Sequence, residues 1–311
     1  MDQEAIRKGA RLVETTSSTS KIRSVHVKSD HLLPNTYIIE SPGALQILLQ
    51  PWLVGAALVN SARESSEDFL RAAFGIVKEF HNSTIDTVTE VVPLAGALYY
   101  SLAEAFEAVF GETINRCFIG AKRRLSDSGW MTDLSYLNFE AMTAQPLILI
   151  GDTIATGGTI ESIIEATLNH IPQVRAIVVY SIAGGLKGAV RLKHLADRIQ
   201  TPIYTFYSNA IFGVEPNGTD MPWLHPGTIA SPEIRDKAEM VYGPDLGRRW
   251  CSIWDWGDRS KHPLKHLHEL VERCDSELSK GPNEQTQAIL ERFRNECHIA
   301  LKSLKRPVSL K

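Results

Sequence analysis

The stretch of sequence that decides the fold is LILIGDTIATGGTIESIIEATL, residues 147–168. A short apolar run opens it, and apolar residues at helical spacing close it, so we predict a buried strand, a turn and a helix. The turn between them contains one acid, Asp152, followed by a Thr-Gly-Gly-Thr run at positions 156–159.

This turn has the features of a binding site for a monophosphate. The first N–H groups of a helix have no partners within it, and the helix dipole favours negative charge there. Two glycines let the backbone approach an anion closely, and two threonine hydroxyls add hydrogen-bond donors. Asp152 would repel a phosphate, so we expect it to accept hydrogen bonds from hydroxyl groups, such as those of a ribose attached to that phosphate.

Two other phosphate-binding motifs are excluded by their spacing. A Walker A loop requires a lysine directly after its last glycine, and no lysine follows Gly157 or Gly158. Residues 184–188 (GGLKG) also follow a predicted strand, but they miss the third glycine position of the GxGxxG dinucleotide motif. A tight strand-to-helix turn that binds no ligand is the remaining alternative.

Short apolar segments alternate with helical patterns through the middle of the chain. The predicted strands are residues 87–92, 116–119, 147–150, 176–182 and 203–207, and the predicted helices are 101–110, 160–168 and 186–198. Strands that lack a two-residue alternation and are separated by helices indicate a parallel sheet covered on both faces. We therefore expect an α/β fold with a Rossmann-like, mostly parallel sheet flanked by helices.

The remaining segments are predicted from periodicity and from helix-breaking residues. We expect two helices in residues 42–80 with a break near 61–67, a long surface loop at 121–138, an irregular Gly-, Pro- and Trp-rich segment at 208–261, and two C-terminal helices at 262–278 and 284–304. Residues 1–23 combine charged residues with a Ser/Thr run, and we predict that they form an arm that is either frayed or docked.

The composition of the 311-residue chain excludes several classes of protein. Its 33 Lys and Arg against 36 Asp and Glu leave no basic field that would favour nucleic acid. The most apolar stretch, residues 45–59, is too short to span a bilayer, and the polar N-terminus does not resemble a signal peptide. The four cysteines are too widely spaced for a metal site. We therefore expect a cytoplasmic protein with neither nucleic-acid nor membrane partners.

Residues 148–159 resemble the phosphoribosyl diphosphate (PRPP) motif of type I phosphoribosyltransferases. In that family the acids of the motif bind the ribose 2′ and 3′ hydroxyls, and the amides of the following turn bind the 5′-phosphate. The resemblance implies that Asp152 binds the ribose. It implies that the phosphate is bound by Ala155, Thr156, Gly157, Gly158 and Thr159. Many members have two adjacent acids, whereas the first position here is Gly151.

Three further segments are similar to motifs of the uracil phosphoribosyltransferases, in the same order. Residues 93–96 (PLAG) resemble a Pro-Arg-Ala-Gly turn in which Leu94 replaces the arginine, and Ala95 and Gly96 would bind diphosphate through the backbone. Residues 120–124 (GAKRR) resemble a Gly-x-x-Arg loop. This second resemblance implies that PRPP is also bound by Lys122, Arg123 and Arg124.

Residues 254–259 (WDWGDR) resemble the third motif, which closes over the base. The resemblance assigns the base to Trp254, Asp255 and Trp256, and it places Asp255 close to Mg²⁺ that is bound mostly through PRPP. Asp258 and Arg259 either belong to this site or pair with each other and fix the loop. The implied catalytic residues are Asp152, Arg123 and Asp255.

The resemblance implies a Mg²⁺-dependent transfer of ribose 5-phosphate from PRPP to a pyrimidine-like base, with uracil giving UMP and diphosphate as the default. Two alternatives stay open: a regulator that binds PRPP or a nucleotide without turnover, and transfer to an acceptor other than uracil. We expect an N-terminal arm at 1–35, a phosphoribosyltransferase-like domain at 36–261 with a lid insertion at about 208–250, and a helical extension at 262–311. A homodimer or higher homo-oligomer is expected.

Overall fold

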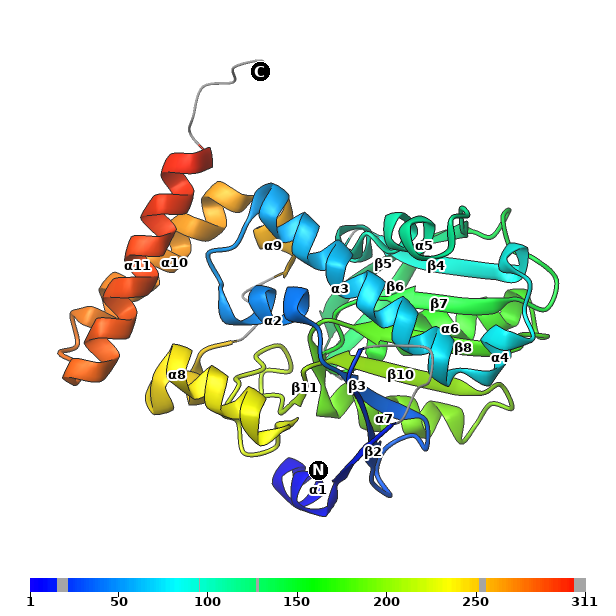
Figure 1. Cartoon of the computed structure of the whole chain (residues 1–311), viewed down its shortest axis with the longest axis horizontal. Coiled ribbons are helices and arrows are strands. Elements are labelled where there is room, and N and C mark those ends of the chain that lie inside the picture. Colours follow the sequence, from blue (N-terminus) through cyan, green and yellow to red (C-terminus); the bar gives the residue numbers. More distant parts are fainter. Residues whose placement is uncertain (16–21, 95, 127–128, 252–255, 305–311) are drawn as a thin grey trace.

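The computed structural model describes residues 1–15, 22–94, 96–126, 129–251 and 256–304 (Figure 1). The described residues form a nine-stranded sheet in the order β1-β2-β3-β10-β8-β7-β4-β5-β6. Its strands are β1 (Arg11–Glu14), β2 (Ser24–Lys28), β3 (Thr36–Ile39), β4 (Val88–Leu94), β5 (Asn115–Ser126), β6 (Gly129–Asn138), β7 (Leu147–Gly151), β8 (Ala176–Ser181) and β10 (Ile203–Ser208). A small second sheet contains β9 (Gly184–Gly185), β11 (Ala210–Phe212) and β12 (Ile229–Ala230).

The six central strands of the large sheet, from β3 to β5, are parallel. Antiparallel strands close both edges: β1 and β2 on one side and β6 on the other. Every residue of β7, β8 and β10 is buried, which explains why these strands read as continuous apolar runs. The expectation of an α/β fold with a mostly parallel sheet flanked by helices is confirmed.

The described helices are α1 (Gln3–Gly9), α2 (Pro42–Leu49), α3 (Gly55–Ile76), α4 (Lys78–His81), α5 (Leu102–Phe110), α6 (Gly158–His170), α7 (Leu186–Ala196), α8 (Pro232–Arg249), α9 (Trp256–Lys261), α10 (Pro263–Leu278) and α11 (Glu284–Leu304), with short 3₁₀ turns at η1 (Ile85–Thr87) and η2 (Gly96–Tyr100). Helices lie on both faces of the large sheet, while α8, α10 and α11 lie to one side of it (Figure 1). Successive side chains of β7 point to opposite faces of the sheet and pack in different hydrophobic clusters. Leu147 and Leu149 pack with α3 and α5, whereas Ile148 and Ile150 pack with α6 and α7.

The predicted break within residues 42–80 is misplaced. The structure ends α2 at Leu49 and begins α3 at Gly55, and α3 continues through residues 61–67. The serines there are not a break, because they face inward: Ser65 contacts the Tyr180 hydroxyl, and Ser66 Oγ donates to the Tyr100 carbonyl over 2.7 Å. A buried polar face on a long helix has the same sequence texture as a loop.

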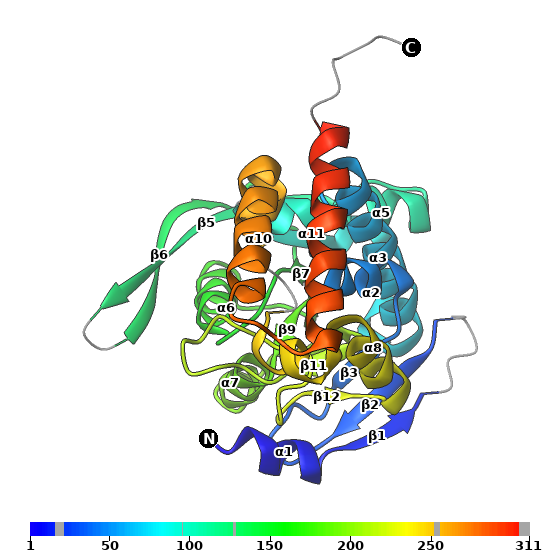
Figure 2. The same ribbon diagram turned by 90° about the vertical axis from the view of Figure 1, so that its left-hand side faces the viewer.

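The predicted surface loop at 121–138 is also wrong. The described residues of this segment belong to β5 and β6, a long antiparallel hairpin that extends away from the body of the protein (Figure 2). A register shift between Gly120 and Ala121 interrupts the pairing. Beyond this shift the described part of the hairpin is largely exposed, so no apolar alternation marks the strands in the sequence.

Residues 208–261 are more regular than expected, because they contain β11, β12 and the helix α8. Inside α8 the backbone kinks at Gly243, with φ 67° and ψ 170°, directly before Pro244. This Gly-Pro pair breaks the helical pattern in the sequence and explains why α8 was missed. The two predicted C-terminal helices are confirmed as α10 and α11, and they pack against each other.

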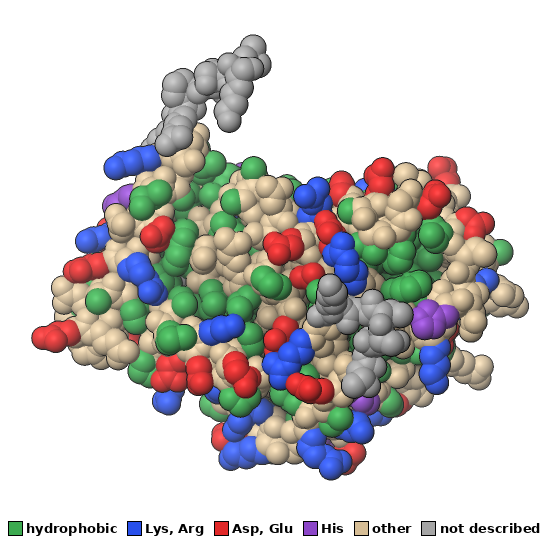
Figure 3. Space-filling model, in the orientation of Figure 1, with side chains coloured by type: hydrophobic (Ala, Val, Ile, Leu, Met, Phe, Trp, Pro, Cys, Tyr) green, Lys and Arg blue, Asp and Glu red, His purple; other side chains and the backbone are tan. Residues whose placement is uncertain are grey.

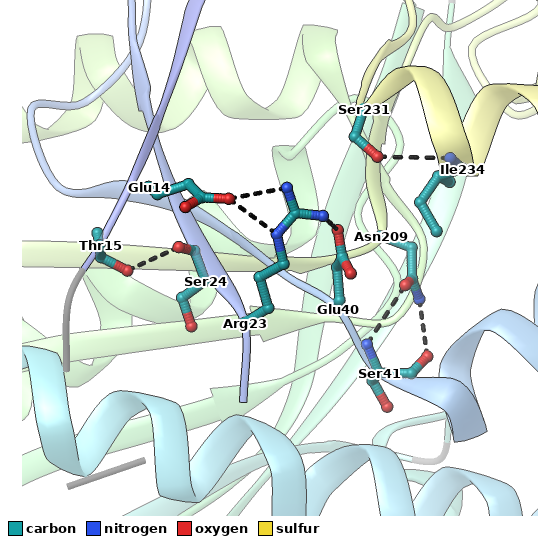
Figure 4. A network of polar contacts seen from close by, with 9 residues as sticks. All are labelled: Glu14, Thr15, Arg23, Ser24, Glu40, Ser41, Asn209, Ser231 and Ile234. Carbon is teal, nitrogen blue, oxygen red and sulfur yellow. Dashed lines mark hydrogen bonds and ion pairs between the residues drawn. The ribbon is translucent and has the colours of Figure 1, made fainter. Parts of the chain in front are cut away.

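The N-terminal segment joins the sheet edge through β1 and β2. Arg23 pairs with Glu14 over 2.9 Å and with Glu40 over 2.6 Å, which links β1 to the end of β3 (Figure 4). Beside it, Asn209 donates to the Ser41 carbonyl over 3.0 Å and joins the end of β10 to the start of α2. Within the described ranges, the helices are all too short or too polar to cross a membrane.

Candidate active site

A cavity of about 700 Å³ lies at the carboxyl ends of β4 and β7. In parallel sheets this edge is the usual place for ligands, because the connecting loops diverge there. The described residues that line it come from five parts of the chain. They are the end of β4 and the residue two positions beyond it (Pro93, Leu94, Gly96), Ala121 of β5, the turn after β7 (residues 152–160), the segment before α9 (Thr219–Met221 and Cys251), and α9 and α10 (Trp256, Gly257, Lys261, His266, Glu269, Leu270, Arg273).

The turn after β7 is fixed in place by the segment that leads into α7. Gly185 N donates to the Ile154 carbonyl over 2.6 Å, and Gly188 N donates to the Ala155 carbonyl over 3.0 Å. A Cβ atom on Gly157, whose φ is +80°, would lie 2.9 Å from Gly188 Cα, so the two backbones touch directly. Residues 184–188, which the sequence analysis excluded as a dinucleotide motif, therefore position the candidate phosphate turn.

The helix α6 begins at Gly158, and its N-cap residue, Gly157, has no side chain that could accept a hydrogen bond from the first turn. Most helices satisfy some of these N–H groups with a capping side chain. Here a turn with open amides and a positive dipole faces the cavity, which is the arrangement expected for an anion.

Asp152 sits at the other end of the turn. Its Oδ1 accepts the Thr153 N–H over 2.8 Å, and its own N–H donates to the Tyr180 carbonyl over 3.0 Å. Burial raises the pKa of this carboxyl to about 7, and the Thr153 hydrogen bond opposes the rise only in part. A carboxylate at the cavity wall that has no cationic partner among the described side chains is suited to hydroxyl groups or a metal-bearing ligand.

Tyr100 accounts for the absence of an acid at position 151. A Cβ atom on Gly151 would lie 3.2 Å from Tyr100 Cδ1 and 3.5 Å from its Cγ, so a side chain there would have to push the fully buried ring aside by a few tenths of an ångström. The Tyr100 hydroxyl accepts the Ile182 N–H over 3.2 Å and lies 3.3 Å from Thr153 Oγ1. The site is thus packed for one acid, at position 152.

Trp256 connects two of the predicted segments. Its Nε1 donates to the Gly96 carbonyl over 3.1 Å, and its ring lies 5.5 Å from the Tyr100 ring. A Cβ atom on Gly96 would lie 3.7 Å from Asp152 Oδ1 and 3.8 Å from Trp256 Cδ1. The structure therefore brings together Trp256, Gly96 and Asp152, which are distant in sequence.

The hairpin touches the phosphate turn near a predicted cationic position. Thr132 Oγ1 lies 3.3 Å from Thr159 Oγ1, and the backbone of Arg123 pairs directly with Thr132 in the ladder. In contrast, Arg124 Nε pairs with Asp133 over 3.0 Å, and the Lys122 side chain is exposed. Neither Lys122 nor Arg124 is among the residues that line the cavity. The side chain of Arg123, together with Ala95, Trp254 and Asp255, lies outside the described part of the chain.

Arg259 is not part of the cavity wall and does not pair with Asp258. Its guanidinium is fully buried and donates to three backbone carbonyls, those of Ile47, Gln50 and Leu53, over 2.6–2.9 Å. Asp258 instead pairs with Lys265. Burial lowers the pKa of Arg259 to about 10. Arg259 therefore fixes the C-terminal end of α2 to the segment that forms the cavity wall.

Sequence reasoning missed the wall formed by α10 and by residues 219–221. His266, for example, lines the cavity while its Nε2 contacts the Pro51 carbonyl over 2.7 Å. These residues follow no strand of the large sheet and match no motif. The only available signal was the amphipathic pattern of residues 262–278, which indicates a buried face but not what that face contacts.

No protein-family model and no curated protein match this chain. Among solved structures, it resembles the AQ2163 protein of Aquifex aeolicus, with 14% identity, a TM-score of 0.46, and coverage of 59% of this chain and 91% of that one. It also resembles a hypoxanthine-guanine phosphoribosyl transferase from L. donovani, with 15% identity, a TM-score of 0.34, and coverage of 50% and 81%.

A third similar structure is the adenine phosphoribosyltransferase of Saccharomyces cerevisiae, with 14% identity, a TM-score of 0.31, and coverage of 65% of this chain and 97% of that one. Since these TM-scores all lie below 0.5, the functional argument for this chain rests on its own residues and on the geometry described above.

Proposed function

We propose that this protein is a phosphoribosyltransferase that uses PRPP as the donor of ribose 5-phosphate. The observation that supports this most strongly is the turn after β7. There the uncapped start of α6 and the half-buried carboxyl of Asp152 lie on the same cavity wall, a few residues apart. In ribose 5-phosphate, one methylene group joins the phosphate to the ribose ring. The phosphate needs amide N–H donors and the ribose hydroxyls need an acceptor, so the two ends of this ligand match the two ends of the turn.

In the proposed reaction a ring nitrogen of the acceptor attacks C1 of PRPP. The bond from C1 to the diphosphate oxygen breaks, the new C–N bond forms, and the acceptor nitrogen loses its proton. The protein's contribution is to bind and orient the two substrates and to exclude water from an oxocarbenium-like C1. The turn amides hold the 5′-phosphate, Asp152 orients the ribose, and Gly96 and the hairpin lie where the diphosphate would leave.

Magnesium fits this site as a partner of PRPP rather than as a metal bound by the protein alone. Among the described residues, no group of three or more His, Cys, Asp or Glu could hold a metal ion. Mg²⁺ commonly binds through one or two carboxylates together with substrate phosphates. Asp152, Asp220 and Glu269 are the carboxylates among the described residues that line the cavity, and Asp255 is the candidate from the sequence. When bound, the ion would neutralise the departing diphosphate.

The acceptor proposed by default is uracil, on the resemblance of residues 254–259 to the uracil-enzyme motif. Trp256 would contribute only its ring to a base, because its indole N–H is already bonded to Gly96. The proposed roles of Trp254 and Asp255 in base binding remain predictions. We also propose a cytoplasmic homodimer or higher homo-oligomer, to be measured by sedimentation.

A second candidate is a regulator that binds PRPP or a nucleotide without turnover. Two features favour it: a first acid at position 151 would crowd the Tyr100 ring, and Leu94 supplies no cation to a leaving diphosphate. A site with these gaps could hold PRPP while stabilising its cleavage poorly.

The decisive experiment incubates the protein with Mg²⁺-PRPP and a panel of pyrimidine and purine bases while diphosphate release is followed. Release that depends on one base supports the transferase and identifies the acceptor. Tight PRPP binding with no release under any base supports the regulator, and no PRPP binding contradicts both. Asp197→Asn is a matched control for Asp152→Asn, because Asp197 is exposed and pairs only with Lys193 in the ion pairs found.

A further inference from the structure

A cationic side chain from α7 lies directly against the candidate phosphate turn. Arg191 Cδ lies 3.4 Å from the position of a Cβ atom on Gly157, and Arg191 Nη1 lies 3.3 Å from that of a Cβ atom on Gly158. Larger residues at either position would displace the guanidinium. The two glycines therefore admit an arginine from a neighbouring helix as well as an anion.

The other side of the same guanidinium is fixed by Glu161, in the first turn of α6. Arg191 Nε lies 2.5 Å from Glu161 Oε2, while Arg198 Nη2 lies 2.7 Å from Oε1 of the same carboxylate. The Glu161 side chain is only 15% exposed, whereas Arg191 is 45% exposed. The Arg191 Nε group is thus paired with an acid, and Nη1 lies beside Gly158, which lines the cavity, although Arg191 itself is not among the lining residues.

We propose that Arg191 is a phosphate-binding residue that contacts a sugar phosphomonoester bound at the start of α6. Its Nη1 group would donate a charge-assisted hydrogen bond to a phosphate oxygen, while Nε keeps its pairing with Glu161. This inference rests on the proposed function, because it takes the turn to be a phosphate site.

The test is a calorimetric titration of ribose 5-phosphate, and separately of Mg²⁺-PRPP, into the full-length protein. Arg191→Gln should weaken binding of both ligands about fivefold, the range expected for a partly exposed ion pair. Arg198→Gln is the matched control, because Arg198 shares Glu161 but does not contact either glycine. It should change binding less than twofold, and both variants should keep the wild-type melting temperature within a few degrees.

A double variant distinguishes direct contact between Arg191 and the phosphate from an effect in which Arg191 only neutralises the charge of Glu161. If Arg191 contacts the phosphate, Glu161→Gln combined with Arg191→Gln stays about as weak as Arg191→Gln alone. Recovery of wild-type affinity in the double variant would overturn the proposal, as would unchanged affinity in Arg191→Gln. If the wild type binds neither ligand, the proposed function itself fails, which distinguishes the two outcomes.

Discussion

At the scale of single residues, Asp152 shows most clearly how the free-energy cost of removing a charge from water can conflict with the proposed use of that charge in ligand binding. Among the described residues the carboxyl accepts one backbone hydrogen bond, and burial raises its pKa from an ordinary value of 3.8 to about 7. A residue chosen for stability alone would be neutral here. Keeping a titratable acid at this wall makes sense if a ligand supplies the missing partners.

Replacing Asp152 with Asn should therefore change how stability depends on pH. Because the folded-state pKa is raised, the unfolded chain loses this proton first, and the wild type loses stability as pH rises from about 4 to about 7. We expect Asp152→Asn to gain on the order of 1–2 kcal/mol relative to wild type over that window, after allowance for partial exposure. Thermal melts of both proteins at pH 4 and pH 8 measure this, and an equal difference at the two pH values would count against it.

Gly151 gives the second prediction at this scale. Introducing an acid there, Gly151→Asp, should lower the free energy of unfolding by about 2 kcal/mol, because the new side chain meets the Tyr100 ring. Gly9→Asp makes the same chemical change where nothing lies within 4 Å, and it should cost under about 0.5 kcal/mol. Urea unfolding measures both. Similar losses in the two variants would show that Tyr100 does not exclude a side chain at position 151.

At the scale of elements, the buried side chain of Arg259 joins α2 to the segment that forms the cavity wall. Arg259 donates to three carbonyls of α2 and the following turn, and it lies between Trp256 and α10 in sequence. Movement of this connection would therefore move the wall. Such a role differs from the one that the motif suggested, in which residues 254–259 act only on the base.

Arg259→Lys should destabilise the protein even though it keeps the charge. An ammonium group cannot reproduce the planar arrangement of donors, so buried carbonyls lose partners and the loss should be about 2–4 kcal/mol. Arg71→Lys, at an exposed pair with Glu67, is the control and should stay within about 0.5 kcal/mol. The free energies come from urea unfolding. A loss no larger than that of the control would refute this role for Arg259.

The elements that could be predicted are those whose sequence reflects burial on both faces. β7, β8 and β10 are wholly buried and were read as strands, and α6 shows its apolar face directly. The hairpin of β5 and β6 was not recognised, because it is largely exposed and has no apolar period. α8 was missed because Gly243 and Pro244 interrupt it. Hydrophobic periodicity does not predict a strand or helix correctly where solvent exposure or a kink determines which residue types are present.

At the scale of the whole molecule, the cavity is assembled from segments that lie far apart in the chain. The turns after β4 and β7 could be predicted from motifs, since each directly follows a buried strand. The wall from α10 and residues 219–221 could not, because its position depends on how the C-terminal helices pack against α8, through contacts such as Phe293 with Tyr242 and Trp250. The charged groups visible in Figure 3 are interspersed by sign, in keeping with the net charge of −3.

The most direct test of the central claim, that the turn after β7 binds the ribose 5-phosphate of PRPP, is calorimetry of Mg²⁺-PRPP with wild type, Asp152→Asn and the control Asp197→Asn. We expect the wild type and the control to bind alike, ribose 5-phosphate to compete, and Asp152→Asn to bind at least about tenfold more weakly, as loss of a hydrogen-bonded charge implies. Binding by Asp152→Asn as tight as by wild type, or no binding by the wild type, would contradict the claim.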